Sequence, residues 1–260
     1  MKKFKLDKWY FDCVSQDGDA FIGYAAKIKF GWLKFCYGAA IFLDKKGAHE
    51  MKQTFYFGDF LETENGDLKW SNSRLGINGT WSGSKGHKMV ELYRNEEGVI
   101  EWQCLKSAAT ALITKSNGDT IAGYGYAEKL SLSLPPWKLP FDELRWGRFI
   151  GDRGCEHMVW IDWRGGTNKN WVWTSSGMFH GHVEENGVSI GQEKLLLNSA
   201  QSIRNGDLSR TLLRSFRWLV NFLPSKLRRI NESKNLSRGI FYSRIKQVEG
   251  WSINEIVKWN

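Results

Sequence analysis

Apolar and polar residues alternate with a period of two along most of the first half of the chain. Every second residue is apolar from 20 to 30, and the pattern repeats from 33 to 43. This period predicts half-buried antiparallel strands. Shorter strands are predicted at 9–15, 51–57, 75–81, 87–94 and 99–106, and a longer one at 120–134. About eight strands joined by short turns predict a closed barrel or a sandwich.

Three of the four prolines fall between Leu134 and Pro140, where they cannot continue a central strand. We therefore place a linker there, between an N-terminal β domain at 1–134 and a C-terminal β domain at 135–260. Strands resume beyond the linker, at 143–150, 155–164, 169–175, 178–184, 187–190, 192–198, 239–248 and 252–259. The predicted fold class is all-β.

Residues 209–230 break this pattern. Apolar residues recur there at steps of three and four, which predicts an amphipathic helix, kinked or split by Pro224. From Arg204 to Lys246 the chain has eleven basic and two acidic residues, which accounts for its whole net charge of +9. Such a helix either covers one mouth of a barrel or lies on an anionic membrane. Because the charge is confined to one segment, nucleic acid is not an expected partner.

Composition narrows the class of protein further. With 260 residues, 42% hydrophobic and 25% charged, the chain is expected to be globular. It has neither a long apolar run nor a signal peptide, so we expect a cytoplasmic protein, with membrane association through 209–230 left open. The four cysteines are far apart in the sequence and are expected to be reduced and buried. Fourteen Trp, 15 Phe and 8 Tyr suit an aromatic-lined cavity or an aromatic domain interface.

Three motifs occur in a suggestive order. They are Trp9-Tyr10-Phe11-Asp12 before a Ser-x-Asp-Gly turn, Gly123-x-Gly125-Tyr126-x-Glu128, and Leu144-Arg145-Trp146-Gly147-Arg148-Phe149. Together they resemble the lipocalin-like superfamily of carotenoid 1,2-hydratases (hydroxyneurosporene synthases), AttH-type proteins and fungal pericyclase relatives. The resemblance covers nearly the whole chain and implies two consecutive lipocalin-like β-barrel domains.

One departure from that family concerns its chemistry. The hydratases carry a cluster of His and Asp directly before the Trp-Gly pair, whereas this chain has Asp142-Glu143-Leu144-Arg145 there, without histidine. The resemblance therefore does not extend to hydratase activity on an isolated alkene.

Glu128 is the first candidate for a catalytic residue. On an extended strand it shares a face with Tyr124, Tyr126 and several leucines. Burial among these groups would favour its neutral form and make it a general acid. Alternatively, Glu128 forms an ion pair with Arg145 or Arg148, which would favour the charged form.

Two aspartates are further catalytic candidates. Asp12 shares a face with Tyr10 and Val14, and the alternative to catalysis is a strand-end or turn-capping role. Asp162 shares a face with Met158 and Trp160, and the same alternative applies to it.

The expected ligand-binding residues are mostly aromatic. They are Tyr10, Tyr124, Tyr126, Trp146, Arg148, Trp160, His180 and His182. For Arg148, a structural ion pair with Asp12, Glu128 or Asp162 is favoured over recognition of an anionic ligand. His180 and His182 project to one face, as two zinc ligands could, but no motif completes such a site. We therefore predict no metal and no cofactor.

These observations lead to two hypotheses. In the first, the chain binds a hydrophobic small molecule (an isoprenoid, polyene or lipid) in an aromatic-lined cavity and catalyses its cofactor-free hydration, cyclisation or isomerisation. In the second, it is a non-catalytic carrier that docks on membranes through 209–230. Whether the protein is an enzyme stays open at this point.

Overall fold

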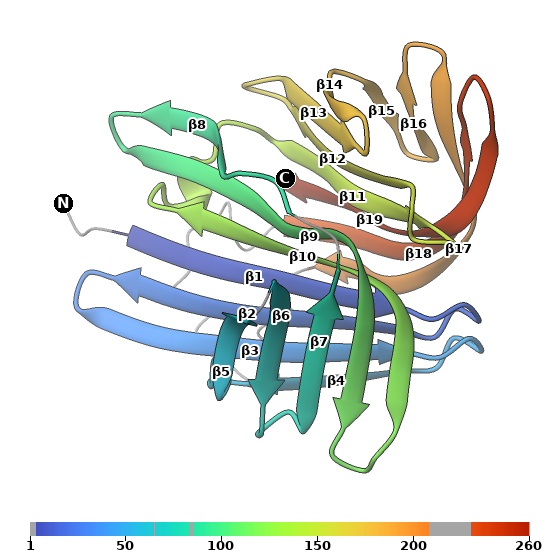
Figure 1. Cartoon of the computed structure of the whole chain (residues 1–260). Helices are drawn as coiled ribbons and strands as arrows, with labels where there is room; N and C mark the ends of the chain where they lie inside the picture. The colour runs from blue at the N-terminus through green and yellow to red at the C-terminus, as the bar shows by residue number, and fades with distance from the viewer. Residues whose placement is uncertain (1–3, 65, 84–85, 208–229, 260) are drawn as a thin grey trace. The chain divides into compact units, whose positions relative to one another are not determined.

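The structure is a computed structural model that describes residues 4–64, 66–83, 86–207 and 230–259 (Figure 1). The regular structure in these ranges is β-strand, apart from one short 3₁₀ turn at Pro136–Lys138. The all-β prediction is therefore confirmed. The predicted helix at 209–230 lies outside the described residues except for Ile230, which begins a strand. No helix in the described ranges is long and apolar enough to cross a membrane.

The chain divides into two compact units, Met1–Pro135 and Pro136–Asn260. The first unit contains β1 (Phe4–Val14), β2 (Ala20–Phe30), β3 (Leu33–Leu43), β4 (His49–Thr54), β5 (Phe60–Glu64), β6 (Asp67–Asn72), β7 (Ile77–Ser82), β8 (Val90–Asn95), β9 (Gly98–Lys115) and β10 (Thr120–Leu132). These ten strands form one antiparallel sheet in the order β4-β3-β2-β1-β10-β9-β7-β6-β5, with β8 paired to β9. β9 and β10 form a long, curved hairpin (Figure 1).

One face of this sheet carries an aromatic core. Phe11 stacks on Trp70 with ring centroids 4.9 Å apart and lies 5.1 Å from Trp81. Phe21 and Ile113 extend the same buried cluster. Burying these large side chains supplies the main hydrophobic stabilisation of the unit, about 1.5–3 kcal/mol for each large apolar group.

The opposite face is buried as well. All seven residues from Ala20 to Ala26 are buried, although alternate side chains point to opposite faces. The sequence pattern predicted a half-buried sheet, and this is wrong for that half of β2. Exposure begins only at Lys27, where the strand approaches its end.

The second unit contains β11 (Glu143–Gly151), β12 (His157–Arg164), β13 (Lys169–Thr174), β14 (Gly177–Phe179), β15 (His182–Glu184), β16 (Gly187–Ile190), β17 (Glu193–Asp207), β18 (Ile230–Tyr242) and β19 (Gln247–Trp259). They form a nine-stranded sheet in the order β14-β13-β12-β11-β19-β18-β17-β16-β15. Phe149, Trp160 and Phe241 belong to its own apolar core. In the described ranges, each sheet is built from strands of one unit alone.

Candidate functional site

A buried carboxyl group on β10 is the centre of the candidate site. Glu128 is 8% exposed. Its Oε2 accepts hydrogen bonds from Trp102 Nε1 at 2.6 Å and from the Tyr126 hydroxyl at 2.8 Å. Trp102 comes from β9, the neighbouring strand of the hairpin. The two donors fix the position and orientation of this carboxyl group.

Tyrosines from three adjacent strands surround Glu128. Tyr10 on β1 is paired with Glu128 on one side and with Tyr24 on the other. The ring of Tyr10 lies edge-on to Tyr24, with centroids 5.5 Å apart, and 6.1 Å from the ring of Tyr126. All three tyrosines are buried. The carboxyl group therefore lies beside a cluster of aromatic rings, on the face opposite the Phe11 core.

The electrostatics of the site keep the Tyr126 hydroxyl and the Cys104 thiol protonated. Burial, with the charge of Glu128 as the next cause, raises the pKa of Tyr126 well above its ordinary value. The same two causes raise the pKa of the buried Cys104 thiol to about 12. Tyr126 therefore keeps its proton at physiological pH and acts as a hydrogen-bond donor.

The hydrogen bonds to Glu128 and its burial favour opposite protonation states. Two donors to Oε2 stabilise the charged carboxylate, whereas burial among aromatic rings stabilises the neutral acid. A carboxyl group in such surroundings can serve as an acid and as a base.

Asp12, the second catalytic candidate, is bound to the backbone of β10. It is completely buried, and its Oδ1 accepts a hydrogen bond from the backbone N–H of Tyr126 at 3.2 Å. Tyr126 lies at a register shift between β9 and β10. The Asp12 carbonyl oxygen accepts a hydrogen bond from Trp81 Nε1 at 2.7 Å. These contacts position Tyr126 and hence its hydroxyl group.

Of the other residues predicted in this unit, Tyr124 is half-buried and lies opposite Val14 on β1, two residues along the strands from the pair of Asp12 and Tyr126. The structure thus brings Tyr10, Tyr126 and Glu128 together. Trp102, Cys104 and Tyr24 complete the group and were not predicted. Alternation within a strand identified the first three, whereas Trp102 and Cys104 depend on cross-strand register.

The remaining predicted residues lie in the second unit. Arg148 is completely buried and donates a hydrogen bond from Nη1 to the carbonyl oxygen of Trp251 at 2.8 Å. Trp146 lies on the same face of β11, with the Lys234 ammonium 5.7 Å from its ring centroid. Trp160 belongs to the apolar core of this unit.

The third acidic candidate and the histidines also have structural partners. Asp162 forms an ion pair with Arg164 at 2.7 Å and accepts a hydrogen bond from Asn170 at 3.3 Å. His180 Nδ1 lies 2.7 Å from the Asn170 carbonyl oxygen, and His182 Nε2 lies 3.3 Å from Glu184. Both histidines are exposed. Among the described residues, no three His, Cys, Asp or Glu side chains are grouped to hold a metal.

Arg145, the alternative partner proposed for Glu128, forms its ion pair elsewhere. Its Nε lies 2.6 Å from Glu143 on the same strand. Burial alone would raise the pKa of Glu143, but the hydrogen bond and charge of Arg145, with Lys258 and Arg164, lower it below its ordinary value.

Comparison with known proteins supports the fold. No protein-family model and no curated protein matches the sequence. Among solved structures, an AttH-type protein from Nitrosomonas europaea is similar, with a TM-score of 0.60 at 9% identity over 99% of this chain and 93% of that one. Kievitone hydratase from Nectria haematococca has a TM-score of 0.54 at 10% identity, over 99% of this chain and 89% of that one.

A third similar structure is CghA with Sch210972, with a TM-score of 0.54 at 10% identity over 98% of this chain and 89% of that one. The expected likeness to lipocalin-like, AttH-type proteins is thus confirmed at the level of fold. At such low identity the likeness concerns the fold alone.

Proposed function

We propose that this protein binds a hydrophobic small molecule and catalyses a cofactor-free hydration, cyclisation or isomerisation of it, with Glu128 as the proton donor. The observation that carries the proposal is the buried Glu128 carboxyl group, oriented by Trp102 and Tyr126 among aromatic rings. A kievitone hydratase with the same fold supports the reaction class, since its name describes addition of water. An isoprenoid, polyene or lipid suits the aromatic surroundings.

The proposed reaction needs one proton and no redox step. The protonated Glu128 carboxyl group gives its proton to one carbon of a substrate double bond, and the other carbon becomes cationic. In a hydration, water adds to this carbon and returns a proton to Glu128. In a cyclisation, a second double bond attacks the cation, and loss of a proton to Glu128 ends the sequence. Aromatic rings such as those of Tyr10 and Tyr24 can stabilise a cation by about 0.5–2 kcal/mol each.

Deuterium incorporation during turnover tests this role. Wild-type protein and Glu128→Gln are incubated in D₂O with farnesol, squalene and linolenic acid, and the extracts are analysed by mass spectrometry. We expect deuterated product from at least one substrate with wild type, and at least a 100-fold lower rate with Glu128→Gln, because general acid catalysis contributes about 10²–10⁴-fold. Binding should persist, because Gln has nearly the same shape.

The matched control is Glu96→Gln, which neutralises an exposed carboxylate in the turn that precedes β9. It should incorporate deuterium at the wild-type rate. Equal turnover by wild type and a folded Glu128→Gln variant would remove Glu128 from the mechanism. Bound, chemically unchanged substrate in both proteins would instead favour the carrier hypothesis.

A further inference from the structure

One end of the first unit is hollowed on the face of the sheet opposite Glu128. A pocket of about 570 Å³ opens there among the first half of β1, the end of β2, the start of β3 and the segment 55–57. In the strand registers, Asp7 pairs with Lys27, and Lys27 pairs with Cys36. These residues alternate in step with Phe11, so the pocket continues the core face towards solvent.

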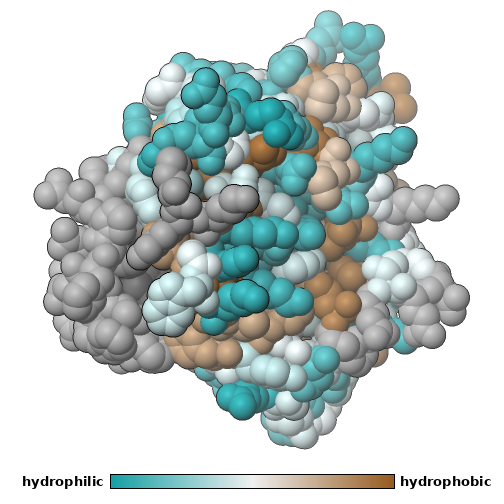
Figure 2. Space-filling view, turned by 90° about the vertical axis from the view of Figure 1, so that its left-hand side faces the viewer, coloured by the Kyte–Doolittle hydropathy of each residue, from teal (hydrophilic) through white to brown (hydrophobic). Residues whose placement is uncertain are grey.

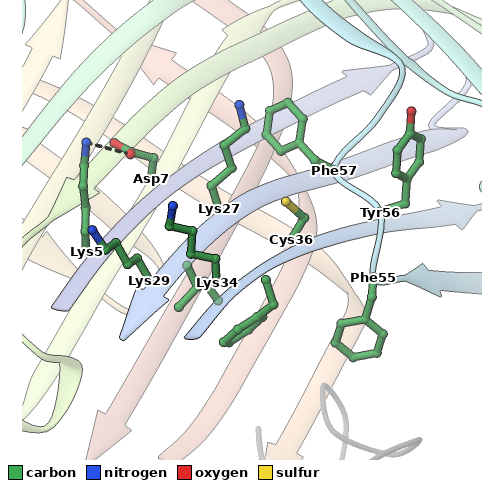
Figure 3. A pocket seen from close by; sticks show the side chains of 11 residues that line it. Lys5, Asp7, Lys27, Lys29, Lys34, Cys36, Phe55, Tyr56 and Phe57 are labelled. Carbon is green, nitrogen blue, oxygen red and sulfur yellow. Dashed lines mark ion pairs between the residues drawn. The ribbon is translucent and has the colours of Figure 1, made fainter. Parts of the chain in front are cut away.

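Lysines give the pocket its charge. Lys5, Lys27, Lys29 and Lys34 line it, against one acid, Asp7 (Figure 3). Lys5 and Lys129 lie 3.1 and 3.7 Å from Asp7. Burial would raise the pKa of Asp7, but the hydrogen bond from Ser131 and the two lysines lower it, so Asp7 is ionised.

The other lysines of the pocket have no acidic partner among the described residues. Neither Lys29 nor Lys34 forms an ion pair there, and the Lys27 ammonium lies 4.4 Å from the ring centroid of Phe57. Three exposed lysines line one opening, where they attract an anion. The pocket is therefore suited to a negatively charged group.

The remaining wall is aromatic and unusually exposed. The segment 55–57 runs along one side of the pocket; the ring of Phe57 is turned towards Lys27 and that of Phe55 to the side opposite the lysines, as Figure 3 shows. Phe35 lines the pocket from β3, on the face opposite Lys34. Phe35 and Phe55 are 45% and 49% exposed, and Trp32 at the adjoining β2–β3 turn is 82% exposed. The space-filling view shows apolar groups exposed among polar ones at the surface (Figure 2). Exposed apolar side chains beside a pocket commonly mark a ligand site.

We propose that this pocket binds an anionic amphiphile, a molecule with one negatively charged head group on an apolar body. The head group is neutralised by Lys27, Lys29 and Lys34, and the apolar body lies against Phe57 and passes the edge of β3 that β4 leaves unpaired, towards Phe35 and Phe55. The volume is within the range of about 300–1,000 Å³ that small-molecule sites occupy. This site is separate from the proposed catalytic site, because Glu128 lies on the other face of β10.

Displacement of a fluorescent fatty acid tests the proposal. Protein is loaded with cis-parinaric acid, which is then displaced by laurate, dodecanol or dodecyltrimethylammonium below their micelle concentrations. We expect laurate to bind at least tenfold more tightly than the neutral or the cationic analogue. The double variant Lys29→Gln/Lys34→Gln should bind laurate about tenfold more weakly, with little change for dodecanol.

The matched control is Lys45→Gln/Lys46→Gln, which removes the same charge from the turn after the far end of β3. It should bind laurate as wild type does. Lys29→Gln/Lys34→Gln should still incorporate deuterium at the wild-type rate, so that failure of this site and failure of the catalytic proposal are distinguishable. Equal affinity for the three amphiphiles, or no effect of the Lys29/Lys34 variant, would overturn the proposal.

A vesicle experiment distinguishes a free amphiphile from a membrane lipid. The protein is sedimented with phosphatidylcholine vesicles that contain or lack phosphatidylserine. Binding of monomeric laurate with no sedimentation supports a site for a free molecule. Sedimentation that laurate competes away supports a site that also takes the anionic head group of a lipid. Sedimentation without any binding of laurate would overturn the proposed pocket.

Discussion

The Cys104 thiol shows how strongly burial acts on a single residue of the candidate site. Burial, then the charge of Glu128, raises its pKa from 9.0 to about 12. Between these two values the folded protein keeps a proton that the unfolded chain loses. The contribution of the Cys104 thiol to the free energy of unfolding is therefore complete below about pH 9 and is lost as the pH rises towards 12. We expect Cys104→Ala to lose less stability than wild type over this window, measured by urea unfolding at pH 7.5, 9 and 10.5.

The control for this prediction is Cys155→Ala, since Cys155 is exposed. It should follow the wild-type dependence on pH. Burial raises the pKa of Tyr126 as well, so the Cys104→Ala variant still loses some stability as the pH rises. Identical pH dependence in wild type and Cys104→Ala would contradict the assigned burial of the thiol.

For single residues, the sequence predicted neighbours along one strand better than neighbours on adjacent strands. Tyr126 and Glu128 were grouped because side chains two apart share a face, and their side chains are hydrogen-bonded. Trp102 was missed although it donates to the same carboxyl oxygen. Its place depends on two register shifts between β9 and β10, and these have no signature in alternation alone.

At the scale of elements, the close pairing of β1 with β10 depends on two glycines. A methyl group on Gly123 would lie 1.9 Å from the Val14 carbonyl oxygen, and one on Gly125 would lie 2.2 Å from that of Asp12. Backbone atoms in a paired strand cannot move away cheaply. We expect Gly125→Ala to lower the free energy of unfolding by about 2–4 kcal/mol, because overpacking forces the two strands apart. Thermal and urea unfolding measure this effect.

Ala122→Ser is the matched control, since Ala122 is exposed on the same strand. Its free energy of unfolding should stay within about 0.5 kcal/mol of wild type. A Gly125→Ala variant as stable as wild type would show that β1 and β10 do not approach so closely. The Gly-x-Gly pattern before Tyr126 thus has a physical reason, the approach of a neighbouring backbone.

Strand prediction worked where alternation was strong. The predicted strands at 20–30 and 33–43 have the observed bounds of β2 and β3. β9 was predicted to end at 106 but continues to Lys115, because Lys106 and Ser107 interrupt the pattern at the register shift. β5 and β6 were missed, since they are short and rich in polar residues.

At the scale of the whole molecule, both units bury polar groups on the sheet face opposite their apolar core. In the first unit this is the Glu128 face. In the second, Arg204 Nη1 lies 2.8 Å from Glu232, and Lys234 Nζ lies 3.7 Å from the same carboxylate. Lys234 also forms an ion pair with Glu255. These ion pairs connect β17, β18 and β19, so breaking them should destabilise this part of the second unit.

The network provides a test of whether the two units unfold separately. Glu232→Gln leaves Arg204 and Lys234 buried without their shared carboxylate, a loss that costs about 3–5 kcal/mol. Because each sheet is built from its own strands in the described ranges, we expect faster hydrogen exchange in β17–β19 and unchanged exchange in β1 and β10. Exchange monitored by mass spectrometry measures both regions in one sample. The exposed Glu185→Gln should leave both unchanged, whereas equal acceleration in both units by Glu232→Gln would mean that the chain unfolds as one cooperative body.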